Sequence, residues 1–156
     1  MVFKTSLMER AELEQYLHQH IPLSQAMQVS VVEVHPEHIV LSAPLAPNIN
    51  HRETVFGGSA SAVAILAAWS LLHTRLAAAG ISSRLVIQRN SMNYEAPILG
   101  TFTARSSITQ PEAWPLFMRM LARKGVARIM VSATLEHAGK SVGHLEGEFV
   151  ALGRSA

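Results

Sequence analysis

The sequence predicts an α+β fold in which a curved, largely antiparallel β-sheet wraps around one long central helix. Three observations support this prediction. The chain repeats a pattern of one helix followed by two strands three times, and the second helix is much the longest. Most strands are joined by connections too short for the crossover that parallel pairing needs, so the strands should pair antiparallel. The long helix is apolar on every side, and such a helix must be enclosed by other elements.

Each element follows from hydrophobic periodicity and from the residues that end the segment. The expected segments, in chain order, are a helix at 6–19, a helical turn at 23–27, strands at 28–34 and 38–45, a helix at 57–80, strands at 84–94 and 101–109, a helix at 112–124, and strands at 126–136 and 142–152. Gly80 and Gly125 stand where two of the helices should end, because glycine readily adopts the left-handed conformation of a helix cap. One domain, residues 1–156, is expected, since this length suits one hydrophobic core.

The composition excludes several kinds of function and favours an assembly. The chain has no cysteine, which excludes disulfides, cysteine-ligated zinc and thiol catalysis. No histidines have the spacing of a metal site, so neither a metal nor a cofactor is expected. The net charge is only +2 and the basic residues are scattered, which does not suit nucleic-acid binding. Hydrophobic residues make up 49% of the chain, which indicates that some apolar surface is buried between subunits.

Neither export nor a membrane span is expected. Residues 1–17 carry charges where a secretory signal would need an apolar run. The longest apolar-rich run, residues 60–72, is shorter than the roughly 20 residues that cross a bilayer. The sequence therefore predicts a soluble cytoplasmic protein.

The segment NHRETVFGGSASAVAILA, residues 50–67, passes from a polar loop into the apolar helix through Phe56, Gly57 and Gly58. This pattern resembles the hotdog-fold acyl-CoA thioesterases, in which an asparagine-bearing loop runs into two glycines at the start of the central helix. The segment NYEAPILGTFTARSSI, residues 93–108, fits the next hairpin of that superfamily. Over nearly its whole length the chain resembles a small family of proposed thioesterases that also occurs as the C-terminal domain of YiiD-type acetyltransferases. The resemblance implies a hotdog fold and hydrolysis of acyl-CoA or acyl-carrier-protein thioesters.

The two glycines suit the chemistry of thioester hydrolysis. Negative charge develops on the carbonyl oxygen as water attacks, and a helix amino terminus offers unpaired N–H groups and a partial positive charge. Glycine also lets a carbonyl approach the backbone closely. Gly57, with Gly58, is therefore predicted to supply oxyanion donors, each worth about 3 kcal/mol of barrier. A purely structural alternative is that the glycines only allow a sharp helix start or close packing.

Asn50 corresponds to the loop asparagine that contacts the reacting water or carbonyl in the related thioesterases, and its amide can both donate and accept. Alternatively, it satisfies its own turn. The sequence departs from many relatives at two positions. Phe56 replaces a histidine, and Ile65 replaces the acid eight residues after the first glycine. Because isoleucine is neither a base nor a nucleophile, the base must come from elsewhere.

The loop holds two candidates for the missing base. His51 is preferred because the imidazole pKa lies near neutrality, although a loop histidine is often merely exposed. Glu53 is the second candidate, and a residue from a partner subunit is the third. Ser61 lies one helical turn after Gly57 and could hold water, or could serve only in a helix–sheet contact.

A homodimer, or a dimer of dimers, is expected to form through the strand that carries Asn90 and Asn93, which would reach the site across the interface. The acyl chain is expected against the helix near Phe56 and Val63, with the pantetheine arm leading to solvent. Two other functions stay open: a non-catalytic acyl-CoA binding or sensing module, and a hotdog hydratase or dehydratase. Apart from a second copy of the chain, the expected partner is thus a small-molecule acyl thioester.

Overall fold

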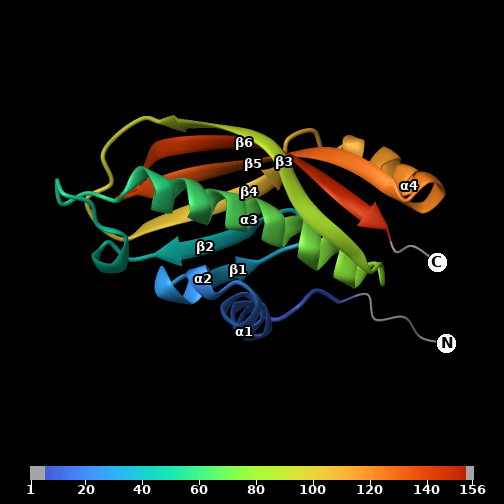
Figure 1. Cartoon of the computed structure of the whole chain (residues 1–156), viewed down its shortest axis with the longest axis horizontal. Helices are drawn as coiled ribbons and strands as arrows, with labels where there is room; N and C mark the ends of the chain where they lie inside the picture. The colour runs from blue at the N-terminus through green and yellow to red at the C-terminus, as the bar shows by residue number, and fades with distance from the viewer. Residues whose placement is uncertain (1–5, 154–156) are drawn as a thin grey trace.

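Six strands form one antiparallel sheet in the order β1-β2-β4-β5-β6-β3 (Figure 1). The computed structural model describes residues 6–153. The elements are α1 (Arg10–His20), α2 (Pro22–Ala26), β1 (Ser30–Val34), β2 (Ile39–Ala43), a 3-10 turn η1 (Ala46–Asn48), α3 (Gly57–Ala78), β3 (Ser83–Tyr94), β4 (Phe102–Ile108), α4 (Ala113–Lys124), β5 (Val126–His137) and β6 (Lys140–Gly153). The predicted order and type of every main element are confirmed.

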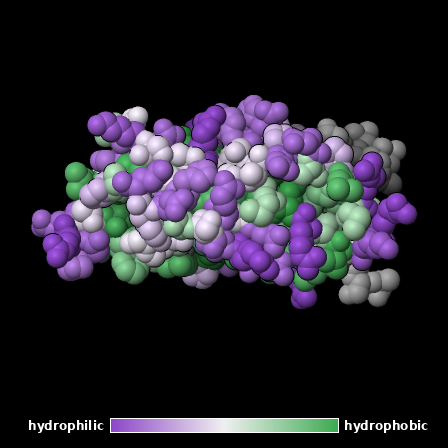
Figure 2. Space-filling model, turned by 90° about the horizontal axis from the view of Figure 1, so that it is seen from above, coloured by the Kyte–Doolittle hydropathy of each residue, from purple (hydrophilic) through white to green (hydrophobic). Residues whose placement is uncertain are grey.

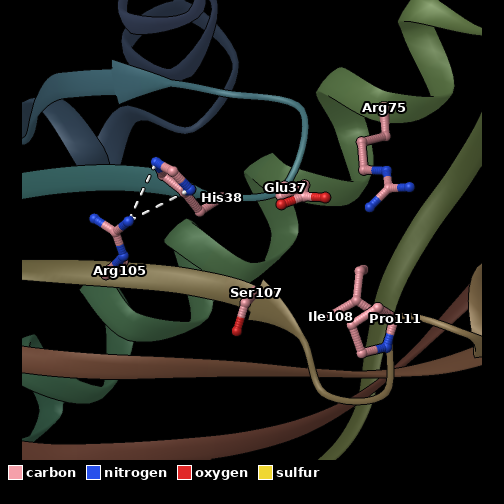
Figure 3. A pocket seen from close by; sticks show the side chains of 7 residues that line it. All are labelled: Glu37, His38, Arg75, Arg105, Ser107, Ile108 and Pro111. Carbon is pink, nitrogen blue, oxygen red and sulfur yellow. Dashed lines mark hydrogen bonds between the residues drawn. The ribbon is translucent and has the colours of Figure 1, made fainter.

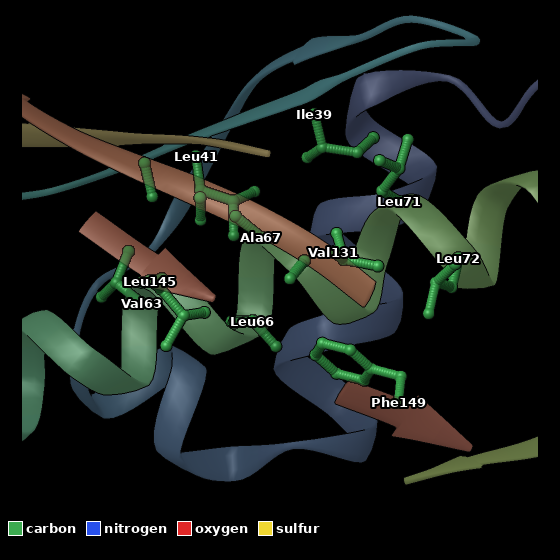
Figure 4. Close-up of a cluster of buried hydrophobic side chains, with 14 of the residues drawn as sticks. Ile39, Leu41, Val63, Leu66, Ala67, Leu71, Leu72, Val131, Leu145 and Phe149 are labelled. Carbon is green, nitrogen blue, oxygen red and sulfur yellow. The ribbon is translucent and has the colours of Figure 1, made fainter. Parts of the chain in front are cut away.

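The helix α3 lies along one face of the curved sheet and contacts all its strands except β1 closely (Figure 1). Four of its buried residues are alanines, whose small side chains let the sheet approach the helix: Ala60, Ala64, Ala67 and Ala68. Larger side chains from α3, β2, β5 and β6 gather in one buried cluster (Figure 4) that includes Leu71, Leu72, Ile39, Leu41, Val131 and Phe149. The all-round apolar helix is therefore the core of the fold, as predicted.

The length argument against a membrane span does not hold for α3. With 22 residues the helix is long and apolar enough to cross a bilayer by length and composition, because helical structure extends well beyond residues 60–72 on both sides. However, 61% of its most apolar window is buried inside this protein. Packing against the sheet therefore explains the apolar character of the helix.

The helix α1 packs against the edge strand β1, and the helix α4 packs against β5 and β6. Leu13 and Leu17 bury one side of α1, and the Glu14 carboxylate accepts a hydrogen bond from the Val31 amide of β1, 2.8 Å away. Phe117 and Leu121 bury one side of α4. The helix α1 begins at Arg10 rather than at the predicted residue 6, and the apolar positions before Arg10 are not helical.

Glycine ends two helices where the sequence predicts it. Gly80 and Gly125 have φ angles of +73° and +72°, in the left-handed region that a side chain disfavours. Ala138 and Gly139 also have positive φ angles and form the two-residue turn between β5 and β6, where His137 pairs with Lys140.

The strand β3 is an edge of the sheet. It pairs along its whole length with β6, from Ser83 opposite Gly153 to Tyr94 opposite Gly143, and its other side pairs with no strand among residues 6–153.

Hydrophilic side chains cover most of the face shown in Figure 2, with hydrophobic side chains in smaller patches between them. Many of the hydrophobic residues of the chain are buried in the core.

Candidate active site

The loop before α3 is a small hairpin that is held by Asn50. The backbone N–H of Asn50 donates a hydrogen bond to Thr54 O at 2.8 Å, and Ile49 forms an isolated antiparallel β-bridge with Val55. The Asn50 side-chain oxygen accepts hydrogen bonds from the amides of Arg52 (2.8 Å) and Thr54 (3.1 Å). Its Nδ2 donates to Thr54 Oγ1 at 2.9 Å. Both lone pairs of Oδ1 are thus used inside the loop, and one N–H of the side chain remains.

A second asparagine, Asn48, fixes the loop to the rest of the protein. It is almost fully buried, and its Nδ2 donates to Met27 O (3.0 Å) and Pro44 O (2.8 Å). Its backbone carbonyl accepts from the Phe56 amide at 2.7 Å, immediately before α3. Asn48 was not predicted as a site residue, since nothing in the local sequence pattern distinguishes a buried asparagine from an exposed one.

The first turn of α3 leaves three amides without a hydrogen bond among the described residues. Ala60 is the first residue of the helix whose amide is bonded, to Phe56 O at 3.0 Å. The amides of Gly57, Gly58 and Ser59 precede it, as expected at a helix start. The first turn also contains no acidic side chain to offset the partial positive charge of the helix terminus.

The two glycines have different surroundings. A Cβ on Gly58 would lie only 2.4 Å from Cε2 of the Phe56 ring, so the glycine leaves room for that ring. A Cβ on Gly57 would meet the Tyr94 ring at 3.4 Å, an ordinary contact distance. Close packing, the structural alternative, therefore accounts for Gly58 and not for Gly57.

Tyr94 connects the end of β3 to the start of α3. Its hydroxyl donates to Gly57 O at 3.2 Å, across 37 positions of sequence. Beside this contact lies a hollow of about 380 Å³. Its walls are mostly apolar and comprise Val55, Gly57, Ala60, Tyr94, Glu95, Ala96, Pro97, Ile98, Leu135 and Val142. Tyr94 and Glu95 were not selected as site residues from the sequence, because only the fold brings residues 94–95 beside residue 57.

A separate apolar groove of about 260 Å³ runs beside α3, and Ile65 lines it. The other lining residues are Ile21, Leu23, Met27, Ala62, Leu66, Trp69, Ile87 and Phe149. The prediction that the acyl chain lies against Val63 is wrong, because Val63 is completely buried in the core. Phe56 itself is 57% exposed.

The remaining predicted site residues lie apart from the hollow beside Gly57. His51 and Glu53 are exposed in the loop, and neither lines that hollow. Glu53 has a φ angle of +65° at the tip of the hairpin. Ser61 is half-buried on α3. Asn90 and Asn93 are exposed on the edge strand β3.

A charged hollow of about 430 Å³ lies near the other end of α3 (Figure 3). Arg75 of α3 stacks on Trp114 at 4.1 Å, and burial lowers the pKa of its guanidinium. Arg105 Nη2 of β4 lies 3.5 Å from His38 Nδ1 and 3.4 Å from His38 Nε2, and Nε2 also lies 3.0 Å from Glu33 Oε2. Glu37 also lines this hollow. These groups contact neither Gly57 nor the free amides, so this hollow is not the candidate active site.

Among residues 6–153, no group of three or more histidine or acidic side chains could hold a metal ion. The chemistry offered beside Gly57 is therefore that of backbone N–H donors, one carboxylate and an apolar wall.

Comparisons with known proteins agree with this fold. A family model described as "Putative thioesterase (yiiD_Cterm)" matches residues 10–153. A solved protein of unknown function from Chlorobaculum tepidum is 28% identical, with a TM-score of 0.88 over 93% of this chain and 94% of that chain. One from Shewanella oneidensis, described as a putative thioesterase, is 25% identical, with a TM-score of 0.81 over 92% and 96%.

A thioesterase from Haemophilus influenzae is only 12% identical, with a TM-score of 0.73 over 98% of this chain and 96% of that chain, and so shows the fold alone. The predicted hotdog fold and family are confirmed. Since the family model spans nearly all of it, the chain belongs to the yiiD_Cterm family of thioesterase-like proteins.

Proposed function

We propose that this protein hydrolyses acyl thioesters, of coenzyme A or of an acyl-carrier protein, at the hollow beside Gly57. The observation that carries the proposal is the positive end of a 22-residue helix, where Gly57 lines the hollow and the amides of Gly57 to Ser59 have no hydrogen bond within the described chain. A thioester carbonyl in the hollow would gain negative charge as water attacks it, and these amides can stabilise that charge. Membership of the thioesterase-like family supports the same reaction.

The apolar groove along α3 is proposed to hold the acyl chain. All nine of its lining residues are apolar, and Ile65 takes the position at which many relatives carry an acid. A carboxylate there would be costly to bury beside a hydrocarbon chain. The substitution that removes the usual base therefore also keeps the groove apolar.

Asn50 is proposed to orient the carbonyl or the water through its one remaining N–H, rather than as a hydrogen-bond acceptor. Both lone pairs of its Oδ1 already bind loop amides. Phe56 would cover Gly58, and Ser61 would border the site one helical turn further on. Neither Asn50 nor His51 lines the hollow, so each can act there only if substrate binding brings the loop over it.

The free edge of β3 supports a dimer. Its twelve residues expose unpaired backbone groups, and edges of this kind readily pair with another strand. Pairing two copies antiparallel about a twofold axis would place Asn90 and Asn93 at the interface. Light scattering on the purified protein should give the mass of a dimer or of a dimer of dimers, and a stable monomer would contradict a shared site.

The test of the function is thiol release from a panel of acyl-CoAs, from acetyl to palmitoyl. The protein has no cysteine, so every thiol detected comes from substrate. Turnover of at least one acyl-CoA supports the hydrolase. Tight binding without turnover would instead indicate a sensing module, and hydration of an enoyl-CoA would indicate a hydratase.

Two variants of Asn50 separate its roles in that assay. Asn50→Asp keeps an acceptor for the two loop amides and removes the side-chain N–H, whereas Asn50→Ala removes both functions. A donor role predicts that both variants lose about tenfold or more in kcat, within the range for one oriented hydrogen bond. Normal turnover by Asn50→Asp, with loss in Asn50→Ala alone, would leave Asn50 only its loop-holding role.

A further inference from the structure

Hydrolysis at the hollow needs a group that takes a proton from water, and Ile65 cannot do this because it is apolar and lines the separate groove. Of the side chains that line the hollow, only Glu95 carries a carboxylate. The loop candidates His51 and Glu53 do not line it. The position of Glu95 therefore bears directly on how the proposed reaction would proceed.

Both the backbone and the side chain of Glu95 are held by β6. Its amide donates to Val142 O at 2.9 Å. The Ser141 hydroxyl donates to Glu95 Oε1 at 3.1 Å. The second oxygen, Oε2, has no hydrogen-bond partner among residues 6–153, and the side chain is exposed to solvent. One oxygen is thus fixed while the other is free to accept from water.

Glu95 and Gly57 line the same hollow, at the place where the end of β3 meets the start of α3. Tyr94, the residue before Glu95, donates its hydroxyl to Gly57 O at 3.2 Å. Consecutive Cα atoms are about 3.8 Å apart, so this bond keeps the end of β3 beside the first residue of α3. Glu95 forms no ion pair within 4.0 Å in the described part of the chain, so no cation neutralises it.

We propose that Glu95 is the general base of the hydrolysis, an assignment that rests on the proposed function. Glu95 Oε2 takes a proton from water while the water oxygen bonds to the thioester carbon. The carbonyl π electrons move to the oxygen, where the amides of Gly57 and Gly58 stabilise them. When the intermediate collapses, the C–S bond breaks and the leaving sulfur takes the proton from Glu95. The products are a carboxylic acid and a thiol, with no oxidation or reduction.

The test compares glutamate-to-glutamine substitutions in thiol release. Glu95→Gln keeps an oxygen for the Ser141 bond but cannot accept a proton, so kcat should fall at least about 100-fold, the scale of general-base catalysis. KM should change less than about threefold, because the amide fills the same space. Glu112→Gln is the matched control, since this exposed glutamate at α4 makes no side-chain cap hydrogen bond, and it should keep wild-type turnover.

Two further readouts separate a base from a structural residue. In the wild type, kcat/KM should fall at low pH with the titration of one carboxylate, and Glu95→Gln should lose that limb. Ser141→Ala should lower kcat only modestly, about three- to tenfold, because it removes the positioning bond and leaves the base. Melting curves should show all three variants folded.

The outcomes distinguish this assignment from the function on which it rests. If the wild type releases thiol and Glu95→Gln retains more than about a third of its kcat, the hydrolase stands and Glu95 is not its base. Loss of turnover in His51→Asn together with full turnover in Glu95→Gln would also overturn the assignment of Glu95 and would make the loop histidine the base. If the wild type releases no thiol from any acyl-CoA or from an acyl-carrier-protein thioester, the hydrolase proposal itself fails.

Discussion

The two ends of the central helix border hollows of similar size and opposite character. At the amino end, a mostly apolar hollow of about 380 Å³ is lined by Gly57, the first of three residues whose amides have no hydrogen bond among residues 6–153. Near the carboxyl end, a hollow of about 430 Å³ is lined by Glu37, His38, Arg75 and Arg105 (Figure 3). Volume or charge alone would favour the second hollow, but the chemistry of a thioester favours the first.

The helix dipole explains the difference. Cations are favoured near a helix carboxyl terminus, and Arg75 occupies the last turn of α3. The chain therefore offsets the partial negative charge at this end with its own side chain. At the amino end, no acidic residue in the first turn offsets the partial positive charge. Unmatched backbone polarity beside a hollow is thus the better indicator of the site, and substitutions at the two ends should have separable effects.

The largest effect on stability should come from the buried carboxyl-terminal half of α3. Leu72 is completely buried, so Leu72→Ala should lower the free energy of unfolding by about 2–5 kcal/mol. Urea unfolding measures this loss. Exposed Leu116 on α4 supplies the matched control, for which leucine-to-alanine should cost less than about 0.5 kcal/mol. Folded Leu72→Ala should keep its kcat; a large loss in kcat would show that the two ends are coupled.

A smaller effect on stability is expected at Arg75. Arg75→Met keeps the apolar stem but loses the stacking on Trp114 and the charge at the helix end, which should cost about 1 kcal/mol. Arg75→Lys keeps the charge and should lose less. Thiol release should stay within about twofold of the wild type in both variants. If Arg75→Met is more stable than the wild type, the arginine does not serve the helix terminus.

The smallest effect is a pH dependence at His73, also in the carboxyl-terminal half of α3. Burial, and then the charge of His20, lower the pKa of His73 below its ordinary value of 6.5. The unfolded chain therefore binds a proton more readily than the folded protein, and this contribution to stability is lost as the pH falls below about 6.5.

His73→Phe preserves an aromatic ring for stacking against Tyr16 and Trp69 and cannot titrate. Unfolding measured at neutral and mildly acidic pH should show a weaker decline for this variant than for the wild type. Identical declines would mean that His73 binds a proton equally well in the folded protein and in the unfolded chain.

Much of the fold could be predicted because local signals agreed with one another. The all-round apolar pattern of α3 requires enclosure, and the short connections require antiparallel pairing. Gly80 and Gly125 end their helices through positive φ angles. The boundaries moved by a few residues where apolar positions such as Leu7 fall outside the helix that follows them.

The candidate site was only partly predictable, because part of it depends on a contact between the end of β3 and the start of α3. Gly57 and Gly58 stand out by their place before an apolar helix. Tyr94 and Glu95 give no such local signal, and only the fold brings the end of β3 beside the start of α3. In the same way, the buried Asn48 and the loop-bound Asn50 look alike in the sequence, although they differ fully in surroundings.

The most direct measurement uses Gly57, the first residue of α3, whose amide has no hydrogen bond within the described chain. Proline suits the first helical position and removes only an N–H that the fold does not use. Gly57→Ala keeps the N–H and adds a Cβ at ordinary contact distance from Tyr94. With both variants folded, Gly57→Pro should lose about 100-fold or more in kcat, and Gly57→Ala should retain most of it. Equal turnover by the two variants would contradict the assignment of this backbone amide as an oxyanion donor.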